Sequence, residues 1–299
     1  MNSGQQGRLL VLASALCFGT TGTAQALGVT GASPVTVGAA RIAVGALGLL
    51  LVARAPLPWR DRRVRLGALG VAGYQPAFFL AVHETGVAVG TVVALGSAPV
   101  VTGLLAWALR RGRPGPRWTA ATALAATGLA VLATGGGADG GVRVTGVLLA
   151  LGAAASYAAY TLATKDLLDA GVPAETAIAA VFAGGAVLLA PALVLLPSGW
   201  VATPAGAAEV LFLGLVPTTL AYVLFARGLG RITAAETSTL TLAEPLTATA
   251  LGVVLLGEHL TAAAVAGGVL LVAGLAVLAL PLRRPDRRIP TGTPSPAAR

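Results

Sequence analysis

The sequence predicts an all-α membrane protein with ten transmembrane helices, arranged as two inverted repeats of five helices, with the N and C termini in the cytoplasm. Three observations lead to this prediction: an apolar composition, a series of apolar runs of membrane-spanning length, and an internal duplication. Of 299 residues, 56% are hydrophobic and 10% are charged, whereas about a quarter of the residues in a soluble domain are charged. The composition therefore favours a polytopic membrane protein.

A repeated hexapeptide reveals the duplication. The letters GLAVLA occur at 128–133 and again at 274–279, an offset of 146 residues. The same offset pairs Leu69 with Leu215, Phe79 with Phe225, Thr91 with Thr237 and Pro99 with Pro245. Self-similarity at a fixed period is the signature of a repeated architecture. We therefore expect a first repeat at 1–137, a second at 138–282, and a disordered cytoplasmic tail at 283–299 that is rich in Arg, Pro, Thr and Ser.

Apolar runs place the helices, because about 20 apolar residues are needed to cross the hydrocarbon core of a bilayer. Short polar connections separate the runs. The first half contains runs at 9–27, 34–52, 66–82, 87–109 and 118–134, and the second half at 144–163, 174–196, 207–226, 234–256 and 261–282. The first run follows Arg8 as a secretory signal would, but it leads into the second without a cleavage site of the Ala-x-Ala type. We expect it to remain as a helix.

Positive charge predicts the orientation. With a cytoplasmic N-terminus, the inner connections collect nearly all the arginines, and the outer connections hold only Arg143, as the positive-inside bias requires. Equivalent connections of the two repeats differ: 110–117 carries four arginines, whereas its counterpart 257–263 carries neither Arg nor Lys. This difference predicts that the second repeat is inverted. The expected location is the plasma membrane, or the inner membrane of a cell that has two.

Several short motifs resemble, in their order, the EamA-type branch of the drug/metabolite transporter (DMT) superfamily. They are Pro34 and Arg41 early in the second run, Glu244 and Pro245 in the ninth, and Gly257 and Glu258 before the last. The resemblance extends from Leu9 to Leu282. One departure is Ala98, which stands where the second repeat has Glu244. The resemblance implies transport of small metabolites or drugs, commonly efflux, through a cavity among the first, third, fourth, sixth, eighth and ninth helices.

Two charged residues fall inside apolar runs. Arg41 lies roughly 10 Å below the outer surface and Glu244 roughly 15 Å deep, near the midplane. Charges at such depths are expensive and face protein or water. Arg41 has the alternative role of capping outer carbonyls, and Glu244 that of a neutral packing residue or the partner of Arg41. Both are candidates for substrate binding or coupling, and Glu244 leaves proton coupling open.

Pro99 and Pro245 are predicted to break helices at matching positions of the two repeats. A proline removes a helical hydrogen bond and frees a backbone carbonyl, and paired breaks of this kind point to the binding site of a transporter. The alternative is a pair of kinks without ligand contact, since membrane helices tolerate proline.

Uncharged polar and aromatic side chains accompany these breaks and suit a cavity for a small amphipathic molecule. The candidates are Tyr74, Gln75, Tyr157, Tyr160, Tyr222, Thr237 and Thr241. For each hydroxyl the alternative is a hydrogen bond to its own helix or to a neighbouring helix.

The predicted function is a secondary transporter of small metabolites or drug-like solutes, an exporter with a central cavity between the two repeats. The alternative is a flippase for lipids or lipid-linked sugars, which a cavity open sideways to lipid would favour. A membrane enzyme is disfavoured because the chain has two histidines and its runs contain no acidic cluster of the kind that binds magnesium. The expected partners are a small-molecule substrate and the lipid bilayer. We expect no cofactor, no metal and no nucleic acid, and the sequence sets no oligomeric state.

Overall fold

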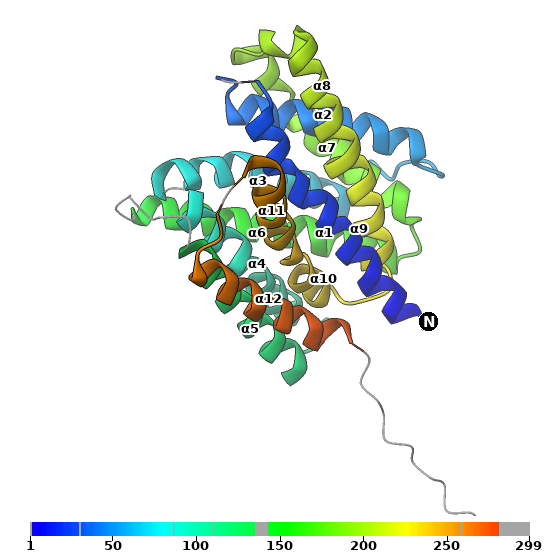
Figure 1. Ribbon diagram of the computed structural model, residues 1–299. Helices are drawn as coiled ribbons and strands as arrows, with labels where there is room; N and C mark the ends of the chain where they lie inside the picture. The colour runs from blue at the N-terminus through cyan, green and yellow to red at the C-terminus, as the bar shows by residue number, and fades with distance from the viewer. Residues whose placement is uncertain are drawn as a thin grey trace, which may run out of the picture.

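All the regular elements that the structure describes are helices, which confirms the predicted all-α class (Figure 1). The computed structural model describes residues 2–29, 31–85, 87–109, 111–134, 143–257 and 259–280. The predicted tail at 283–299 lies outside these ranges. In chain order the helices are α1 (Ser3–Leu27), α2 (Pro34–Val52), α3 (Arg62–Thr85), α4 (Val87–Ala108), α5 (Pro116–Thr134), α6 (Val144–Asp169), α7 (Ala174–Leu195), α8 (Pro204–Gly214), α9 (Ala221–Leu229), α10 (Ala234–Leu240), α11 (Ala243–Leu256) and α12 (Ala262–Ala279).

Nine segments in the described part of the chain are long and apolar enough to cross a membrane. Two of them combine a pair of helices: Pro204–Leu229 contains α8 and α9, and Ala234–Leu255 contains α10 and α11. The predicted run at 118–134 is also helical, as α5, but this helix is not among the nine segments, because it is short and starts with Pro116, Arg117 and Trp118. The chain is thus a multi-pass membrane protein, and the passage of α5 across the membrane stays a prediction.

Some helices are longer than their apolar runs, because polar contacts extend them past the apolar part. α1 begins at Ser3, where Asn2 and Gln5 form a capping box that satisfies free N–H groups of the first turn. α6 continues to Asp169, which forms an ion pair with Lys165 one turn earlier at 2.8 Å. Hydropathy alone therefore underestimates the length of these helices, because it misses their polar ends.

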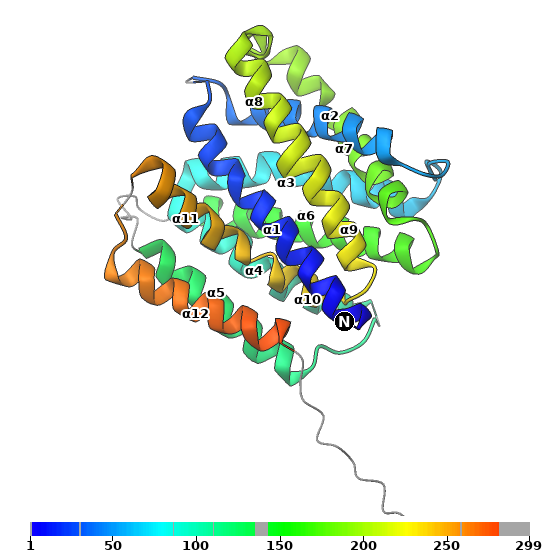
Figure 2. The ribbon, with the colours of Figure 1, turned by 45° about the vertical axis from the view of Figure 1, so that its right-hand side comes forward.

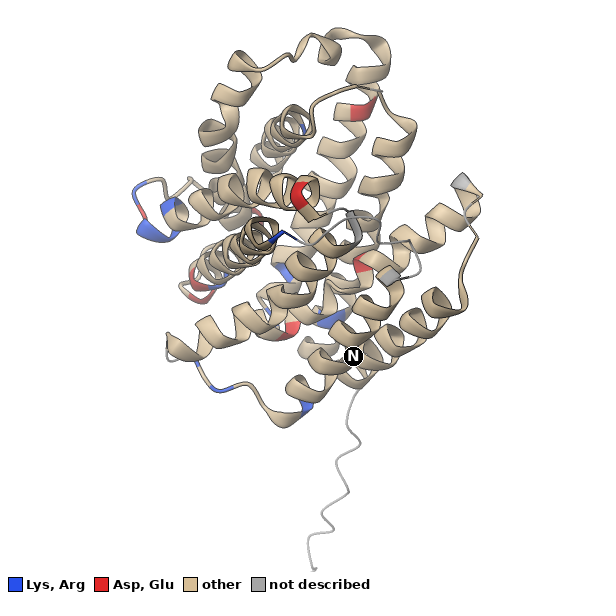
Figure 3. Ribbon diagram, turned by 90° about the vertical axis from the view of Figure 1, so that its left-hand side faces the viewer, with Lys and Arg blue, Asp and Glu red and all other residues tan. Residues whose placement is uncertain are grey.

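Helices that are distant in the sequence pack side by side. α5 lies beside α12, α3 beside α6, and α2 beside α7. α1 runs along both α9 and α11, as Figure 2 shows. Charged residues lie mainly at helix ends and connections, and long stretches of helix carry none (Figure 3). Each of these pairs joins the first half of the chain to the second, so the core is built between the two halves.

The contact between α5 and α12 is unusually close. A Cβ atom added at Gly267 would lie 2.7 Å from the carbonyl oxygen of Gly128, and one added at Gly274 would lie 2.8 Å from that of Ala121. Residue numbers rise along α12 as they fall along α5, so the two helices are antiparallel. Small residues allow such close approach of helix backbones in membranes.

We expect Gly267→Ala to destabilise the protein, because the added methyl group would meet backbone atoms of α5, which cannot rotate away. Overpacking of this kind typically costs about 1–3 kcal/mol. The adjacent Gly268→Ala is the matched control, since the nearest atom to its added Cβ is 3.7 Å away. Thermal unfolding in detergent, followed by size-exclusion chromatography, should show a lower midpoint for Gly267→Ala only. Equal midpoints for the two variants would contradict the close contact.

Pro217 accompanies the division between α8 and α9. Residues Leu215–Leu220 form a π-helical turn there. Proline has no N–H, so the carbonyl four residues earlier, at Leu213, loses its helical donor. The Thr218 hydroxyl donates to that carbonyl at 2.8 Å instead. π-helical turns are frequent at functional sites, and this one immediately precedes the helix that carries Tyr222.

The division between α10 and α11 lies at Thr241 and Leu242. The Glu244 N–H donates to the Thr241 carbonyl at 2.9 Å, which is a tighter turn than an α-helical one. Pro245 lies in the first turn of α11. Backbone N–H groups of a first turn have no acceptor within the helix, so proline costs no helical hydrogen bond there. The repeat mate Pro99 lies inside α4, which continues past it. A break thus occurs beside Pro245, whereas α4 continues as one helix through Pro99 and is not broken there.

Candidate functional site

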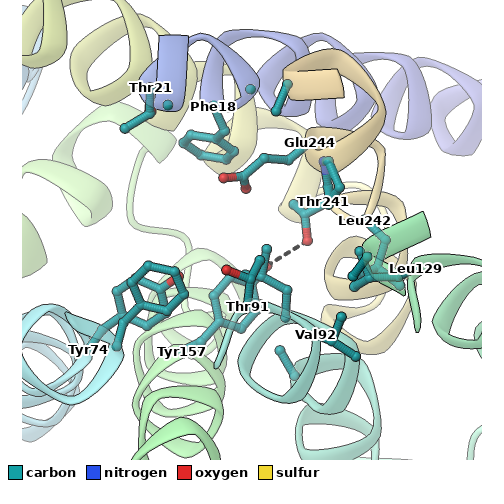
Figure 4. Close-up of a pocket in the computed structure, with 18 of the residues that line it drawn as sticks. Phe18, Thr21, Tyr74, Thr91, Val92, Leu129, Tyr157, Thr241, Leu242 and Glu244 are labelled. Carbon is teal, nitrogen blue, oxygen red and sulfur yellow. Dashed lines mark hydrogen bonds between the residues drawn. The ribbon is translucent and has the colours of Figure 1, made fainter. Parts of the chain in front are cut away.

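A large cavity lies among helices from both halves of the chain (Figure 4). Its volume is about 750 Å³, within the range of roughly 300–1,000 Å³ that is typical of small-molecule sites. α1 to α5 contribute lining residues from the first half, and α6, α9 and the α10–α11 segment contribute from the second. The lining combines aromatic, aliphatic and polar side chains with two charged ones.

Helical spacing selects which residues face the cavity. The lining residues of α1 are Phe18, Gly19, Thr21, Gly22 and Gln25. Phe18, Thr21, Gly22 and Gln25 occupy positions i, i+3, i+4 and i+7, so they lie on one face of the helix. The same spacing relates Tyr74 to Phe78 and Gln75 to Phe79 on α3. Each helix therefore presents one stripe to the cavity.

Glu244 enters the cavity from the first turn of α11. The positive end of the helix dipole favours a negative charge at that position. None of the described residues donates a hydrogen bond to its carboxylate, and Figure 4 shows the carboxylate oxygens pointing into the space between α11 and the two tyrosines, Tyr74 and Tyr157. The carboxylate is thus free to bind a proton or a ligand.

Close packing of α1 against α11 brings an aromatic ring to Glu244. A Cβ atom at Gly19 would lie 2.8 Å from the Glu244 carbonyl oxygen, so a larger residue would push the helices apart. The neighbouring Phe18 projects into the cavity beside Glu244 (Figure 4). Its ring centroid is 4.9 Å from that of Tyr222. The carboxylate therefore lies next to an aromatic wall.

Arg41 enters the cavity from α2. When the Gln75 amide is oriented with its oxygen towards Arg41, this oxygen accepts hydrogen bonds from Nε and Nη2 of the guanidinium group, each at 3.2 Å. Gln75 itself is buried. A neutral amide fixes the guanidinium without cancelling its charge, and no described carboxylate forms an ion pair with Arg41.

Three tyrosines form much of the remaining polar lining. The hydroxyl of Tyr157 is 3.1 Å from that of Thr241, at the division between α10 and α11. The hydroxyls of Tyr160 and Tyr222 are 3.3 Å apart. The Tyr157 and Tyr160 rings meet edge to face, with centroids 5.1 Å apart. These contacts hold the tyrosines rigidly, and rigid groups orient a ligand with little loss of conformational entropy.

The predicted site residues are brought together with two exceptions, Thr237 and Pro99. Those that line the cavity are Arg41, Tyr74, Gln75, Tyr157, Tyr160, Tyr222, Thr241 and Glu244, together with Pro245. Thr237 instead lies outside it: the residue is fully buried, and its hydroxyl donates to the Thr233 carbonyl at 2.9 Å. Pro99 also lies outside the lining, although its neighbour Ala98 is part of it.

Sequence reasoning missed several lining residues, among them Phe18, Phe78, Phe79 and Thr91. A signal for two of them was present. Phe78 and Phe79 lie four residues after the candidates Tyr74 and Gln75, and helical spacing extends the same stripe to them. Phenylalanine in an apolar run was indistinguishable from a lipid-facing or packing residue.

Comparison with known proteins gives consistent results. A sequence model described as the EamA-like transporter family matches residues 5–134 and 144–280. The chain is 43% identical over 281 residues to the uncharacterized transporter YwfM of Bacillus subtilis, covering 92% of this chain and 94% of that protein. It is 32% identical over 254 residues to a probable terminal-alkyne amino-acid exporter of Streptantibioticus cattleyicolor, covering 82% and 83%. A solved crystal structure resembles it in fold, with a TM-score of 0.77 at 24% identity, covering 91% and 95%.

Proposed function

Because the chain belongs to the EamA-like transporter family, we propose that it is a secondary transporter that exports small metabolites or drug-like solutes across the plasma membrane. The observation that carries the proposal is the cavity, which has the size of a small-molecule site and contains two charged residues, Arg41 and Glu244. Export is favoured by the relative described as a probable amino-acid exporter. Amino acids are therefore the first solutes to test.

We further propose that the two halves, 1–137 and 138–282, are inverted repeats around this cavity. The family model matches the chain twice, once in each half. The last helices of the halves, α5 and α12, carry the repeated hexapeptide and are antiparallel, as mates in inverted repeats would be. Transporters of this architecture bind their substrates between the repeats, near discontinuous helices, and the division beside Glu244 fits that rule.

Transport by purified protein in proteoliposomes tests the function. Radiolabelled amino acids and other small metabolites should be screened for uptake with and without a pH gradient, using protein-free liposomes as the baseline. We expect at least one solute to enter in a protein-dependent manner. Stimulation by the gradient would indicate proton coupling through Glu244. Protein-dependent lipid flipping without solute uptake would instead establish the flippase alternative.

The orientation gives a separate prediction. In a Cys17→Ser background, a cysteine at Gly199 should react with an impermeant maleimide added to intact cells, whereas cysteines at Gly115 and Ala170 should react only after the membrane is opened. Gly199 and Gly115 are exposed and have no atom within 4 Å of an added Cβ, so both tolerate the change. The expectation follows from the excess of arginine in the inner connections. Labelling of Gly115→Cys in intact cells would reverse the orientation.

A further inference from the structure

We infer that the transported solute is a zwitterion, an α-amino acid with an apolar side chain, whose ammonium group binds Glu244 and whose carboxylate binds Arg41. This inference rests on the proposed function, since it names the substrate class and binding mode of the same cavity. It follows from the arrangement of charge, aromatic surface and apolar surface in the lining.

The two charges of the lining are opposite and not paired with each other. Among the described residues that line the cavity, Arg41 and Glu244 are the charged ones, and no ion pair joins them. Opposite charges attract strongly in a low-dielectric interior, and an unpaired charge there is unfavourable. A solute with one charge of each sign satisfies both residues, whereas a simple cation or anion leaves one of them unpaired.

The surroundings of Glu244 suit an organic ammonium group. Phe18 and Tyr222 both line the cavity, and their rings form adjoining walls with centroids 4.9 Å apart. Aromatic faces attract ammonium groups through cation–π interactions. A metal ion is a poorer fit, because Mg²⁺ or Ca²⁺ requires several oxygen ligands, and Glu244 is the one carboxylate among the lining residues that the structure describes.

The surroundings of Arg41 suit a carboxylate. The Gln75 oxygen holds Nε and Nη2 at 3.2 Å each, which leaves the Nη1 hydrogens and the second Nη2 hydrogen without a described acceptor. A guanidinium presents its donors in a planar fork that matches the two oxygens of a carboxylate. Gln75 is thus a positioning residue for the guanidinium, and the solute supplies the negative charge.

The rest of the lining predicts the side chain of the solute. Val92 and Leu95 of α4, and Leu129 and Leu132 of α5, form an apolar wall that Phe78 of α3 extends. A second charge on the solute would face this wall without a partner, because the described residues of the lining include no third charged one. Burying an unpaired charge is unfavourable, so an apolar side chain is selected.

Binding to purified full-length protein in detergent, measured by calorimetry, tests the inference with three matched probes. L-Phenylalanine carries both charges, 2-phenylethylamine lacks the carboxylate, and 3-phenylpropionate lacks the ammonium group. We expect phenylalanine to bind about 30-fold more tightly than either analogue, because each analogue leaves one charge of the cavity unpaired. L-Lysine, with a second cation, should also bind more weakly than phenylalanine.

Two variants should produce a crossed pattern. Glu244→Gln should lose the preference for phenylalanine over 3-phenylpropionate and keep the preference over 2-phenylethylamine. Arg41→Gln should do the reverse. Glu209→Gln and Arg231→Gln, outside the cavity lining, are the matched controls and should keep both preferences. If either residue had a purely structural role, its substitution would weaken the binding of all probes equally, and this outcome would contradict the assignment.

The affinities of the wild-type protein for the three probes test both contacts even if a variant fails to fold. Equal affinities for phenylalanine and 2-phenylethylamine would exclude the carboxylate contact, and equal affinities for phenylalanine and 3-phenylpropionate would exclude the ammonium contact. If phenylalanine does not bind but proteoliposomes transport another class of solute, the zwitterion is excluded and the proposed function stands. If proteoliposomes transport no solute at all, the proposed function itself fails.

Discussion

Glu244→Gln is expected to reduce transport about tenfold or more while leaving a folded, membrane-inserted protein, a loss equivalent to about 1.4 kcal/mol of binding or activation free energy. The amide has nearly the size of the carboxyl group but removes its negative charge. The carboxylate accepts no hydrogen bond from the described residues and faces the cavity, so the fold loses no contact on substitution. Initial rates in proteoliposomes, compared at equal amounts of monodisperse protein, measure the effect.

Glu209→Gln is the matched control for this prediction. Glu209 is buried, and it accepts a hydrogen bond from the Val29 N–H at 2.8 Å, which an amide oxygen also accepts. It lies outside the cavity lining, so we expect near-normal transport. Normal transport by Glu244→Gln would remove Glu244 from the mechanism and direct attention to Tyr160 and Tyr222. Loss of folded yield would instead show that Glu244 is a structural residue, a role that the absence of an ion pair with Arg41 argues against.

The fold was largely predictable because a bilayer restricts a chain to few structures. Backbone groups in hydrocarbon must be satisfied internally, so long apolar runs become helices, and the run at 34–52 corresponds to α2 as Pro34–Val52. Helix ends outside the apolar region were less predictable, because local caps such as that of Asn2 decide them. The division beside Pro217 takes a π-helical form that depends on hydroxyl contacts such as that of Thr218, which an apolar pattern does not reveal.

Sequence could identify a site residue where the residue type is unusual for its surroundings, as a charged residue is inside a membrane. Arg41 and Glu244 stood out because charges are rare at membrane depth, and both line the cavity. Thr237 was misplaced because a hydroxyl in a helix bonds its own backbone as readily as a ligand, and sequence does not distinguish the two. Phe18 was missed for the opposite reason, since an apolar residue is not unusual inside a membrane and only its helical position reveals its role.

The closed part of the bundle lies around α10, next to the cavity. The lining residues of α1, α3 and α5 lie in the C-terminal parts of these helices, and those of α4 in its N-terminal part. These parts lie on the outer side in the predicted orientation. Three side-chain contacts hold α10 on the other side: Arg8 Nη2 to Glu236 Oε1 at 2.9 Å, Trp118 Nε1 to the Ala235 carbonyl at 2.9 Å, and the hydroxyls of Thr122 and Thr239 at 2.8 Å. In the proposed secondary transport, alternating access requires these contacts to open.

A disulfide between α5 and α10 should therefore stop transport completely and reversibly. In a Cys17→Ser background, we expect Thr122→Cys and Thr239→Cys together to form this disulfide on mild oxidation. The native hydroxyl oxygens stand where the sulfur atoms would be, 2.8 Å apart, so an S–S bond of about 2.05 Å needs only a small further approach. The bond would keep α10 against α5 and prevent the inner side from opening. Oxidised protein in proteoliposomes should be inactive, and reduction should restore its transport.

The two single-cysteine variants, treated in the same way, control for loss of the hydroxyl pair and for damage by the oxidant. Each should transport similarly before and after oxidation. Mass spectrometry of the oxidised double variant must show the linked peptides, so that inactivity is assigned to the bond. If the linked protein transports normally, α5 and α10 move as one unit and the inner side opens along α1 instead. Of the three contacts, the partly exposed Arg8–Glu236 ion pair would then be the one that breaks.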